Sequence, residues 1–214
     1  MFTPKAAIFD LDGTLFDSMW VWKKIDEEFL LRRGCVCTPE YTNAIKAMGW
    51  LEGAIYTIEK YHLSETPEQV MQAWFDMSEE FYTHRVEMKP FAKEYLLALH
   101  EKGIPLAVAT SMEPQANISK SLSSHGIESL FRNITLSTEV TRGKGFPDIY
   151  LLAAERLGVA PSECAVFEDI LTGIRGAGKG GFQTVGIFDS LSENDWSTIC
   201  EESTLAVRSW EELL

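Results

Sequence analysis

The sequence predicts an α/β protein whose core is a doubly wound, Rossmann-like parallel sheet with an inserted α-helical cap domain. Short apolar runs alternate with helical segments along most of the chain, which is typical of a parallel sheet covered by helices. Between residues 19 and 84, by contrast, helical spacing prevails and no strand pattern occurs. The length of 214 residues suits one α/β domain with a modest insert. We therefore expect a core at 1–17 and 86–214 and a helical insert at 18–85.

Residues 6–9 form the first predicted strand, and two aspartates follow it. A continuous apolar run is typical of a buried parallel strand, and open α/β sheets bind their ligands at the carboxyl ends of the strands. In an extended chain Asp10 and Asp12 point the same way, because side chains alternate with a period of two. Two carboxylates at such a short separation need a nearby cation or a shared proton. The pair predicts a metal-assisted site with one nucleophile and one acid or base.

Two simpler interpretations of Asp-x-Asp-Gly are a calcium-binding loop and a surface turn. A calcium loop requires a ligand at its twelfth position, where this chain has Val21. A surface turn is disfavoured because an apolar strand precedes the aspartates, and Leu15 and Phe16 follow them.

The insert is expected to consist of helices. Apolar residues at helical spacing precede Gly34, and further helices are predicted at 40–48 and 51–61. Thr66 is a typical N-cap residue and Pro67 a typical first residue of another helix. Apolar residues again recur at helical intervals in this helix.

After Lys89 the alternation of strand and helix returns. We expect helices at 91–102, 114–125 and 147–157, another helix before residue 184, and strands at 105–110, 134–136, 165–167, 184–187 and 205–207. This alternation predicts a parallel sheet with helices on both faces.

Polar side chains stand at or just beyond the ends of the other predicted strands: Thr110, Ser111, Lys144, Glu168 and Asp169. Each signal is weak alone, because a hydroxyl at a strand end often caps a helix and a lysine beside glycines is usually solvated. Two acids that end an apolar strand suit a hard cation such as Mg²⁺. Since the carboxyl ends of parallel strands share one edge of the sheet, we expect these groups to converge on Asp10.

The order of these motifs (Asp-x-Asp, then Ser/Thr, then Lys, then an acidic pair) resembles that of the haloacid dehalogenase superfamily of phosphohydrolases. The likeness covers essentially the whole chain. A helical cap between the first and second motifs marks the subgroup of β-phosphoglucomutases and small-molecule phosphatases such as phosphoglycolate phosphatase. The resemblance implies a Mg²⁺-dependent phosphatase that hydrolyses a small phosphorylated metabolite through an aspartyl-phosphate.

The resemblance also implies roles for single residues. Asp10 attacks phosphorus, and Asp12 protonates the leaving oxygen and then deprotonates the hydrolytic water. Thr110 and Lys144 hold and neutralise the transferring phosphoryl group, and Ser111 contributes to substrate binding.

The implied metal is Mg²⁺. By the same resemblance it is held by Asp10, by the backbone carbonyl of Asp12 and by Asp169, with Glu168 nearby.

The chain departs from the family pattern around this site. Gly145 stands where the family often has the first proline of Lys-Pro-x-Pro, and Ile170 stands where it often has serine. Gly176 and Gly180 stand where alanine is usual, at a cost of roughly 0.5–1 kcal/mol each within a helix. We expect these changes to loosen the surroundings of the site without removing a reacting group.

The glycine-rich stretch 173–181 resembles two nucleotide-binding motifs. For a P-loop, Gly180 stands where the Ser or Thr that binds Mg²⁺ is needed. For a dinucleotide motif, the glycines come too far after the strand that ends near Phe167. A glycine-rich helix and its end are the better interpretation.

A carboxyl group at position 12 favours phosphate esters, because the dehalogenases and phosphonate hydrolases of the superfamily lack it. Mutases commonly have a histidine early in the cap, and an ungapped count places Trp22 there, which favours hydrolysis. A β-phosphoglucomutase-like sugar phosphomutase is the alternative, and a non-catalytic metal-binding regulator is a third hypothesis.

The loop at 47–50 is expected to determine the substrate specificity. We expect Lys46 and Trp50 to contact the substrate. Trp20, Trp22 and Trp50 either line a pocket for an apolar or sugar-ring leaving group or pack the interior of the cap. The sequence leaves both possibilities open.

The composition limits the class of partner. A formal charge of −13 argues against nucleic acid and anionic membrane surfaces, which require Lys and Arg. No stretch approaches the roughly 20 apolar residues of a membrane span, and the first residues do not resemble a signal peptide. The four cysteines have neither zinc spacing nor an evident disulfide pattern. We expect a cytoplasmic monomer with reduced cysteines.

Overall fold

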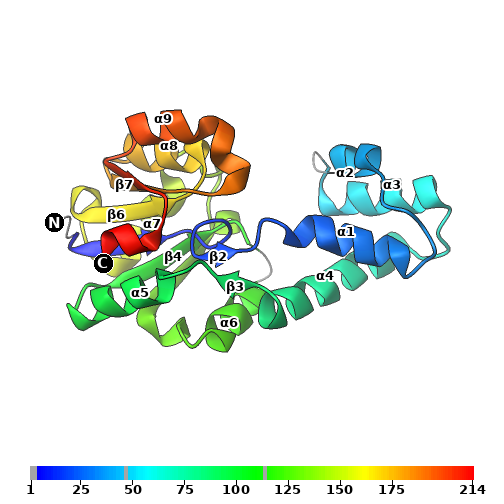
Figure 1. Cartoon of the computed structure of the whole chain (residues 1–214), viewed down its shortest axis with the longest axis horizontal. Helices are drawn as coiled ribbons and strands as arrows, with labels where there is room; N and C mark the ends of the chain where they lie inside the picture. The colour runs from blue at the N-terminus through cyan, green and yellow to red at the C-terminus, as the bar shows by residue number, and fades with distance from the viewer. Residues whose placement is uncertain (1–3, 46–47, 113–114) are drawn as a thin grey trace. The chain divides into compact units, whose positions relative to one another are not determined.

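The computed structural model describes residues 4–45, 48–112 and 115–214. The chain divides into two compact units (Figure 1). Met1–Met19 together with Glu87–Leu214 are termed the core unit, and Trp20–Val86 the helical unit. The helical unit is therefore one continuous segment, inserted between two parts of the core unit.

The core unit is built on a parallel sheet, as predicted. In the described residues six strands pair in the order β5-β4-β1-β6-β7-β8, and each of these pairings is parallel. The strands are β1 (Ala6–Phe9), β4 (Leu106–Thr110), β5 (Phe131–Leu136), β6 (Cys164–Glu168), β7 (Gln183–Ile187) and β8 (Leu205–Val207). All residues of β1, β4 and β6 are buried, because helices cover both faces of the sheet.

The covering helices confirm the doubly wound α/β fold (Figure 1). They include α5 (Ala92–Glu101), α6 (Gln115–Ser124), α7 (Asp148–Leu157), α8 (Leu171–Lys179) and η5 (Trp210–Leu213). On one face, Ile8 and Val166 pack in a cluster with α7 and α8. On the other face, the rings of Phe9 and Phe167 stack at 4.5 Å between centroids, beside Trp210.

β1 is the strand at which the chain reverses its direction across the sheet. From β1 the chain passes to β4 and β5 on one side, and then to β6, β7 and β8 on the other. In open α/β sheets such a reversal leaves a crevice at the carboxyl ends of the strands, where ligands bind. Asp10 directly follows β1, so the topology places it at that point.

The helical unit consists, over its described residues, of α1 (Val21–Leu31), α2 (Pro39–Ile45), α3 (Trp50–Tyr61) and α4 (Pro67–His84). Thr66 caps α4: its hydroxyl accepts the N–H of Gln69, and the Gln69 side chain accepts the N–H of Thr66. The buried residues of α4 include Val70, Trp74, Met77 and Phe81, which recur at helical intervals. Propensity, capping and periodicity therefore agree for this helix.

Sequence patterns missed several short elements of the described chain, including β2 (Phe16–Asp17), β3 (Glu87–Met88), α9 (Trp196–Glu202) and the 3-10 helices such as η5. β2 and β3 form an antiparallel pair near the two ends of the inserted segment, and two residues are too few to show a period. The helix α9 buries Trp196 and Ile199, which is too little for a recognisable apolar face.

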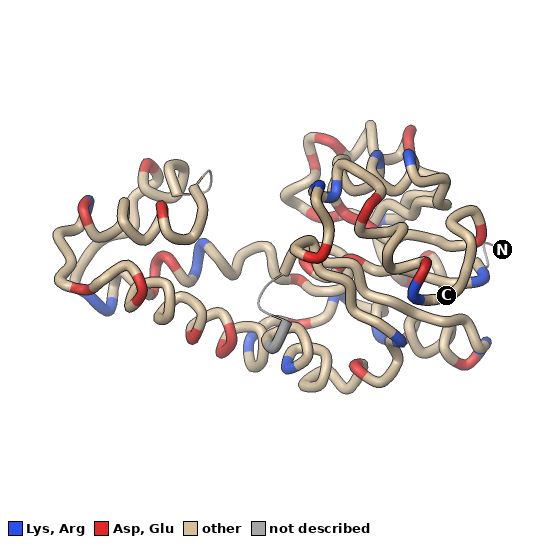
Figure 2. The backbone as a smooth tube through the Cα atoms, turned by 180° about the vertical axis from the view of Figure 1, so that it is seen from behind, with Lys and Arg blue, Asp and Glu red and all other residues tan. Residues whose placement is uncertain are grey.

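Charged residues of both signs are interspersed along both units, without a continuous basic stretch in the described chain (Figure 2). None of the described helices combines the length and the apolar composition that crossing a membrane requires.

Candidate active site

Asp10 lies at the end of the central strand of the sheet. Its N–H donates to the carbonyl of Phe167 at 3.0 Å, which ties the residue to the neighbouring strand β6. Only 5% of Asp10 is exposed. The next turn requires φ +79° at Gly13, a backbone conformation that glycine adopts readily. Any other residue would also place its Cβ only 2.3 Å from Asp169 Oδ2. The chain therefore needs glycine at position 13 to bring this turn against Asp169.

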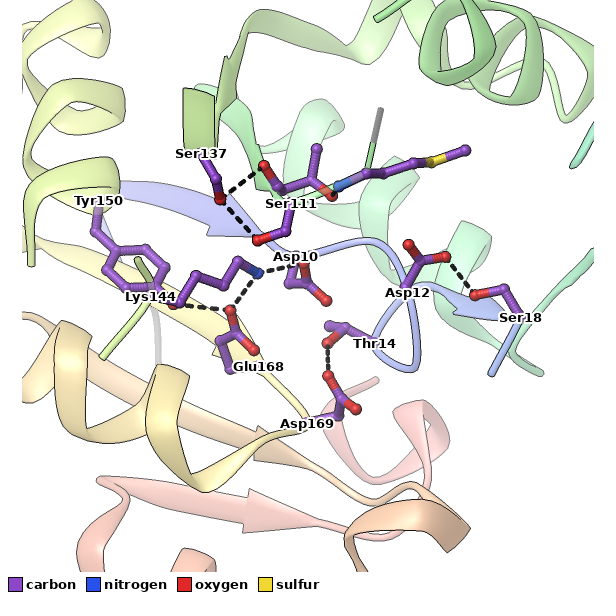
Figure 3. A network of polar contacts seen from close by, with 12 residues as sticks. Asp10, Asp12, Thr14, Ser18, Ser111, Ser137, Lys144, Tyr150, Glu168 and Asp169 are labelled. Carbon is purple, nitrogen blue, oxygen red and sulfur yellow. Dashed lines mark hydrogen bonds and ion pairs between the residues drawn. The ribbon is translucent and has the colours of Figure 1, made fainter. Parts of the chain in front are cut away.

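Lys144 lies between two carboxylates (Figure 3). Its Nζ forms ion pairs with Asp10 and, at 2.6 Å, with Glu168, and 8% of its side chain is exposed. Burial opposes the positive charge, but Asp10 and Glu168 outweigh burial and raise the pKa of Lys144. A lysine beside glycines is usually solvated, whereas this one is an enclosed permanent cation that can neutralise an anion.

Within the described residues, the carboxylate of Asp10 lies close to two others, those of Glu168 and Asp169. One oxygen each from Asp10, Glu168 and Asp169 lie within 4.8 Å of one another. Burial raises the pKa of Glu168 to about 7, against the opposing effect of Lys144. Burial, followed by the charges of Asp10 and Glu168, also raises the pKa of Asp169 well above its usual range. Such crowding destabilises the ionised carboxylates unless a cation joins them.

The donor set fits Mg²⁺. Glu168 Oε2 and Asp169 Oδ2 are buried and have no hydrogen-bond partner among the described residues. Buried polar oxygens normally have a partner, and hard cations prefer oxygen ligands of this kind. The second oxygen of Asp169 accepts the hydroxyl of Thr14 at 3.0 Å, which orients the carboxylate.

Asp12 lines the same pocket as Asp10 and has a hydrogen-bond partner of its own. Its Oδ1 accepts a hydrogen bond from the Ser18 hydroxyl at 2.5 Å, and the side chain extends toward Ser18 (Figure 3). Asp12 also forms a β-bridge with Phe16, and the turn of this loop begins only at Gly13. Two further carboxylates, of Glu168 and Asp169, lie close to that of Asp10.

Thr110 and Ser111 lie where the sequence predicted, at the end of β4. Thr110 is buried, and its Oγ1 accepts the N–H of Met112 at 3.0 Å. Ser111 is exposed, and its hydroxyl lies 2.6 Å from that of Ser137. With Asp10, Asp12, Lys144 and Asp169, these two residues line a pocket of about 160 Å³ in the core unit.

The predicted loosening around the site is wrong for Gly176 and Gly180. A Cβ on Gly176 would lie 1.8 Å from the carbonyl oxygen of Lys144, and a Cβ on Gly180 would lie 2.9 Å from Cβ of Pro147. Both glycines permit a close approach between α8 and the loop that carries Lys144. Because glycine has no side chain, α8 and this loop lie closer together than alanine would allow. Helix propensity alone suggested a looser arrangement.

Two substrate-binding residues, Lys46 and Trp50, are predicted outside the core unit, and the structure describes only Trp50. Lys46 lies outside the described residues. Trp50 begins α3 and is 37% exposed, and its ring stacks on Phe75 at 4.5 Å between centroids. It also lies edge-on to Trp22 at 5.2 Å. Trp50 therefore contributes to the packing of the helical unit and keeps part of its surface exposed.

Sequence reasoning missed the groups that orient the predicted ones. Tyr150, fully buried on α7, donates its hydroxyl to Glu168 Oε1 at 2.8 Å. Three hydroxyl groups act in a similar way: that of Thr14 bonds to Asp169, that of Ser18 to Asp12 and that of Ser137 to Ser111. Thr14 and Ser18 follow the first motif directly, which is a usable signal. No local pattern connects Tyr150 or Ser137 to the site.

Comparison with known proteins agrees with this geometry. A family model described as haloacid dehalogenase-like hydrolase matches residues 7–187. A phosphorylated carbohydrates phosphatase of Thermotoga maritima is 28% identical over 211 residues, which cover 98% of this chain and 96% of the relative. A fructose-1-phosphate phosphatase of Escherichia coli is 28% identical over 181 residues, which cover 84% and 94%.

The fold is shared with solved structures as well. That of a β-phosphoglucomutase candidate from Thermotoga maritima is 28% identical with a TM-score of 0.84, over 98% of this chain and 96% of the other. Since the family model spans most of the sequence, and its relatives are phosphatases, the chain belongs to the haloacid dehalogenase-like hydrolase family and is a phosphohydrolase enzyme.

Proposed function

We propose that the protein is a Mg²⁺-dependent phosphatase that hydrolyses a small phosphomonoester through an aspartyl-phosphate on Asp10. The observation that carries this proposal is the position of Asp10, in contact with Lys144 and beside the carboxylates of Glu168 and Asp169. Phosphoryl transfer needs a fixed nucleophile and positive charge around the phosphoryl oxygens. Lys144 supplies part of that charge. Mg²⁺ held by Asp10, Asp169 and the backbone carbonyl of Asp12, with Glu168 beside it, would neutralise the remainder.

The reaction then proceeds in two displacements. A carboxylate oxygen of Asp10 forms a bond to phosphorus while the bond from phosphorus to the ester oxygen breaks, and Asp12 gives that oxygen its proton. Asp12 next removes a proton from water, whose oxygen attacks phosphorus. The bond between Asp10 and phosphorus breaks, inorganic phosphate leaves, and Asp10 regains its carboxylate. The hydrogen bond from Ser18 to Oδ1 keeps the Asp12 carboxyl group oriented.

Thr110, Ser111 and Lys144 are proposed to bind the phosphoryl group. All three line the same pocket as Asp10, and Lys144 already pairs with the nucleophile. A phosphoryl oxygen that approaches Asp10 would meet the ammonium group and the two hydroxyls together. This part of the site would serve any phosphomonoester alike.

The substrate class is proposed from the relatives. The names of the phosphatases from Thermotoga maritima and Escherichia coli both specify carbohydrate phosphates. We therefore propose a carbohydrate phosphate as the first class to test. We also propose that the helical unit is a cap that contacts the leaving group, through Trp50 and Lys46.

A sugar phosphomutase is the alternative, supported by the likeness to the β-phosphoglucomutase candidate. Hydrolysis is favoured because Trp22, rather than histidine, stands at the position that mutases commonly use early in the cap. In this chain Trp22 packs edge-on against Trp50. A mutase would interconvert two sugar phosphates with little release of inorganic phosphate, which separates the two hypotheses.

The deciding experiment measures phosphate release from a panel of sugar phosphates, polyol phosphates, nucleotides and aryl phosphates, with Mg²⁺ and with EDTA. We expect Mg²⁺-dependent release from at least one ester. Asp10→Asn should abolish it, because an amide cannot act as the nucleophile. Circular dichroism would show that the variant is folded. Near-normal turnover by Asp10→Asn, or turnover unaffected by EDTA, would contradict the mechanism, and isomerisation without phosphate release would indicate the mutase.

A further inference from the structure

The loop that carries Lys144 is held in place although its sequence is flexible. Gly143 and Gly145 flank Lys144, and both have the wide conformational freedom of glycine. The Lys144 side chain is nevertheless enclosed, with its Nζ between Asp10 and Glu168. Something outside the loop must therefore fix its backbone, because a long lysine side chain on a free loop would lose its position.

The helix α8 approaches this loop closely at Gly176. A Cβ on Gly176 would lie 1.8 Å from the Lys144 carbonyl oxygen and 3.1 Å from that of Phe146. No side chain larger than hydrogen fits between the helix and the loop. Gly178 of the same helix differs, since apart from its own stretch of helix no described atom lies within 4 Å of a Cβ placed there.

Polar and aromatic contacts also hold the loop. Lys179, at the end of α8, donates from Nζ to the carbonyl of Gly145 at 3.0 Å. Its Nζ also lies 5.4 Å from the centroid of the Phe146 ring, and the guanidinium carbon of Arg142 lies 4.4 Å from that centroid. Arg142 in turn pairs with Asp148 at 2.9 Å, which joins the two ends of the loop.

We propose that Gly176 and Lys179 of α8 are positioning residues, which dock the loop 143–146 so that Lys144 Nζ is held against Asp10. This inference rests on the proposed role of Lys144 in binding the phosphoryl group. A proline after the lysine would stiffen the loop through its fixed φ. In this chain Gly145 lacks that restraint, and docking on α8 replaces it.

The first test compares Gly176→Ala with Gly178→Ala. Both change the same helix by one methyl group, but only the first places it against the Lys144 carbonyl. We expect Gly176→Ala to lower kcat/KM by about 10- to 100-fold, because a displacement of about 1 Å can cost that much. Gly178→Ala should retain the activity of the wild type. Equal activities for the two variants, together with equal protection of Lys144 in the measurement described next, would overturn the proposal.

A second measurement follows the position of Lys144 without any substrate. An amine-reactive reagent modifies exposed lysines, and peptide mass spectrometry can compare Lys144 with Lys5, whose side chain is 73% exposed. We expect protection of Lys144 in the wild type and in Gly178→Ala, and severalfold faster modification in Gly176→Ala. Unchanged protection in Gly176→Ala would overturn the proposal.

Lys179→Met keeps the test decisive if Gly176→Ala does not fold. It removes one hydrogen bond at the surface, and we expect a 3- to 10-fold loss of kcat/KM with faster modification of Lys144. An unchanged rate of modification would overturn the docking role of Lys179. If modification becomes faster while hydrolysis is unaffected, docking by α8 is supported and the proposed phosphoryl-binding role of Lys144 is wrong.

Discussion

The site of the core unit and the aromatic cluster of the helical unit hold their side chains in different ways. Around Asp10 the ionisable groups are buried, and charge-assisted hydrogen bonds fix Lys144 and Glu168. In the aromatic cluster (Trp22, Trp50, Trp74 and Phe75) the described contacts are between rings, at 4.5 to 6.2 Å between centroids. Trp22 and Trp50 remain 41% and 37% exposed.

This difference separates two tasks. Hydrogen bonds between buried charges are directional, so they suit a reaction that needs one geometry. Ring contacts are broad and tolerate rotation, so they suit a surface that adapts to different leaving groups. On the proposed function, a change in the core unit should therefore alter the rate with every substrate. A change in the aromatic cluster should instead alter the preference among substrates.

After Asp10→Asn, the largest effect is expected from Asp12→Ala. Without an acid, an alkyl phosphate such as a sugar phosphate should lose about 10²- to 10⁴-fold in kcat. An aryl phosphate with a good leaving group needs no proton in the first step, so it should still give a burst of one phenol per enzyme, followed by slow turnover. Rapid-quench kinetics on both esters measures this. Equal losses with no burst would show that Asp12 does not act as the acid.

A smaller effect is expected for Asp169→Asn. The asparagine keeps an oxygen for the Thr14 hydroxyl but removes one negative charge from the carboxylate cluster. The Mg²⁺ concentration for half-maximal activity should rise by about 10- to 100-fold. The Mg²⁺-dependent increase in Tm should shrink in parallel, which gives a readout independent of turnover.

The metal-free form of this variant supplies a control with the opposite sign. Burial and neighbouring charges raise the pKa of Asp169 in the folded state, so its ionised form opposes folding as the pH rises. Metal-free Asp169→Asn should therefore be at least as stable as the wild type at pH 8. A large loss of stability there would point to a structural role for Asp169 rather than to metal binding.

Trp50→Ala tests the other side of the comparison. If Trp50 contacts the leaving group, the ratio of kcat/KM between a sugar phosphate and an aryl phosphate should change by about 3- to 10-fold. Trp74→Phe is the matched control, because Trp74 belongs to the same aromatic cluster but is only 5% exposed. A uniform loss in both variants would assign Trp50 to packing alone.

The smallest effect on activity is expected at Asp26, which is half-buried on α1. Burial, and then the charge of Glu27, raises its pKa to about 7 from the ordinary value of 3.8. The folded state therefore holds this proton more tightly than the unfolded state. The stability that results is complete below about pH 4 and is lost as the pH rises through 7.

Asp26→Asn should accordingly stabilise the protein at pH 8, by about 1–2 kcal/mol after allowance for solvent screening, and change little at pH 4. Denaturant unfolding at the two pH values measures this. Asp76→Asn makes the same chemical change at an exposed position of α4 and is the control. Equal effects of Asp26→Asn at both pH values would contradict the raised pKa.

The sequence predicted the parts of the fold that depend on burial and order along the chain. β1, β4 and β6 are buried on both faces, so their apolar runs marked them clearly. Because all three are parallel, the polar residues at their ends had to meet, and Asp10, Thr110 and Asp169 do line one pocket. Their proposed roles in the reaction stay predictions.

Features that depend on contacts between distant segments could not be predicted. Tyr150 reaches Glu168 only because α7 packs on the sheet, and a tyrosine on an apolar helix face gives no sign of this. Gly176 was misinterpreted for the same reason. Its helix propensity is a local property, whereas its contact with the Lys144 carbonyl comes from the docking of two segments.

The insertion of the helical unit also bears on the order in which the chain folds. Ala7 pairs with Leu106, so the strands β1 and β4 must find each other across the whole inserted segment. Closing a long, disordered loop is entropically costly, whereas helices that are close along the chain form quickly. A helical unit that folds early would shorten this loop, because the pairing of Phe16 with Met88 joins its two ends. We therefore expect the insert to assist assembly of the sheet that it interrupts.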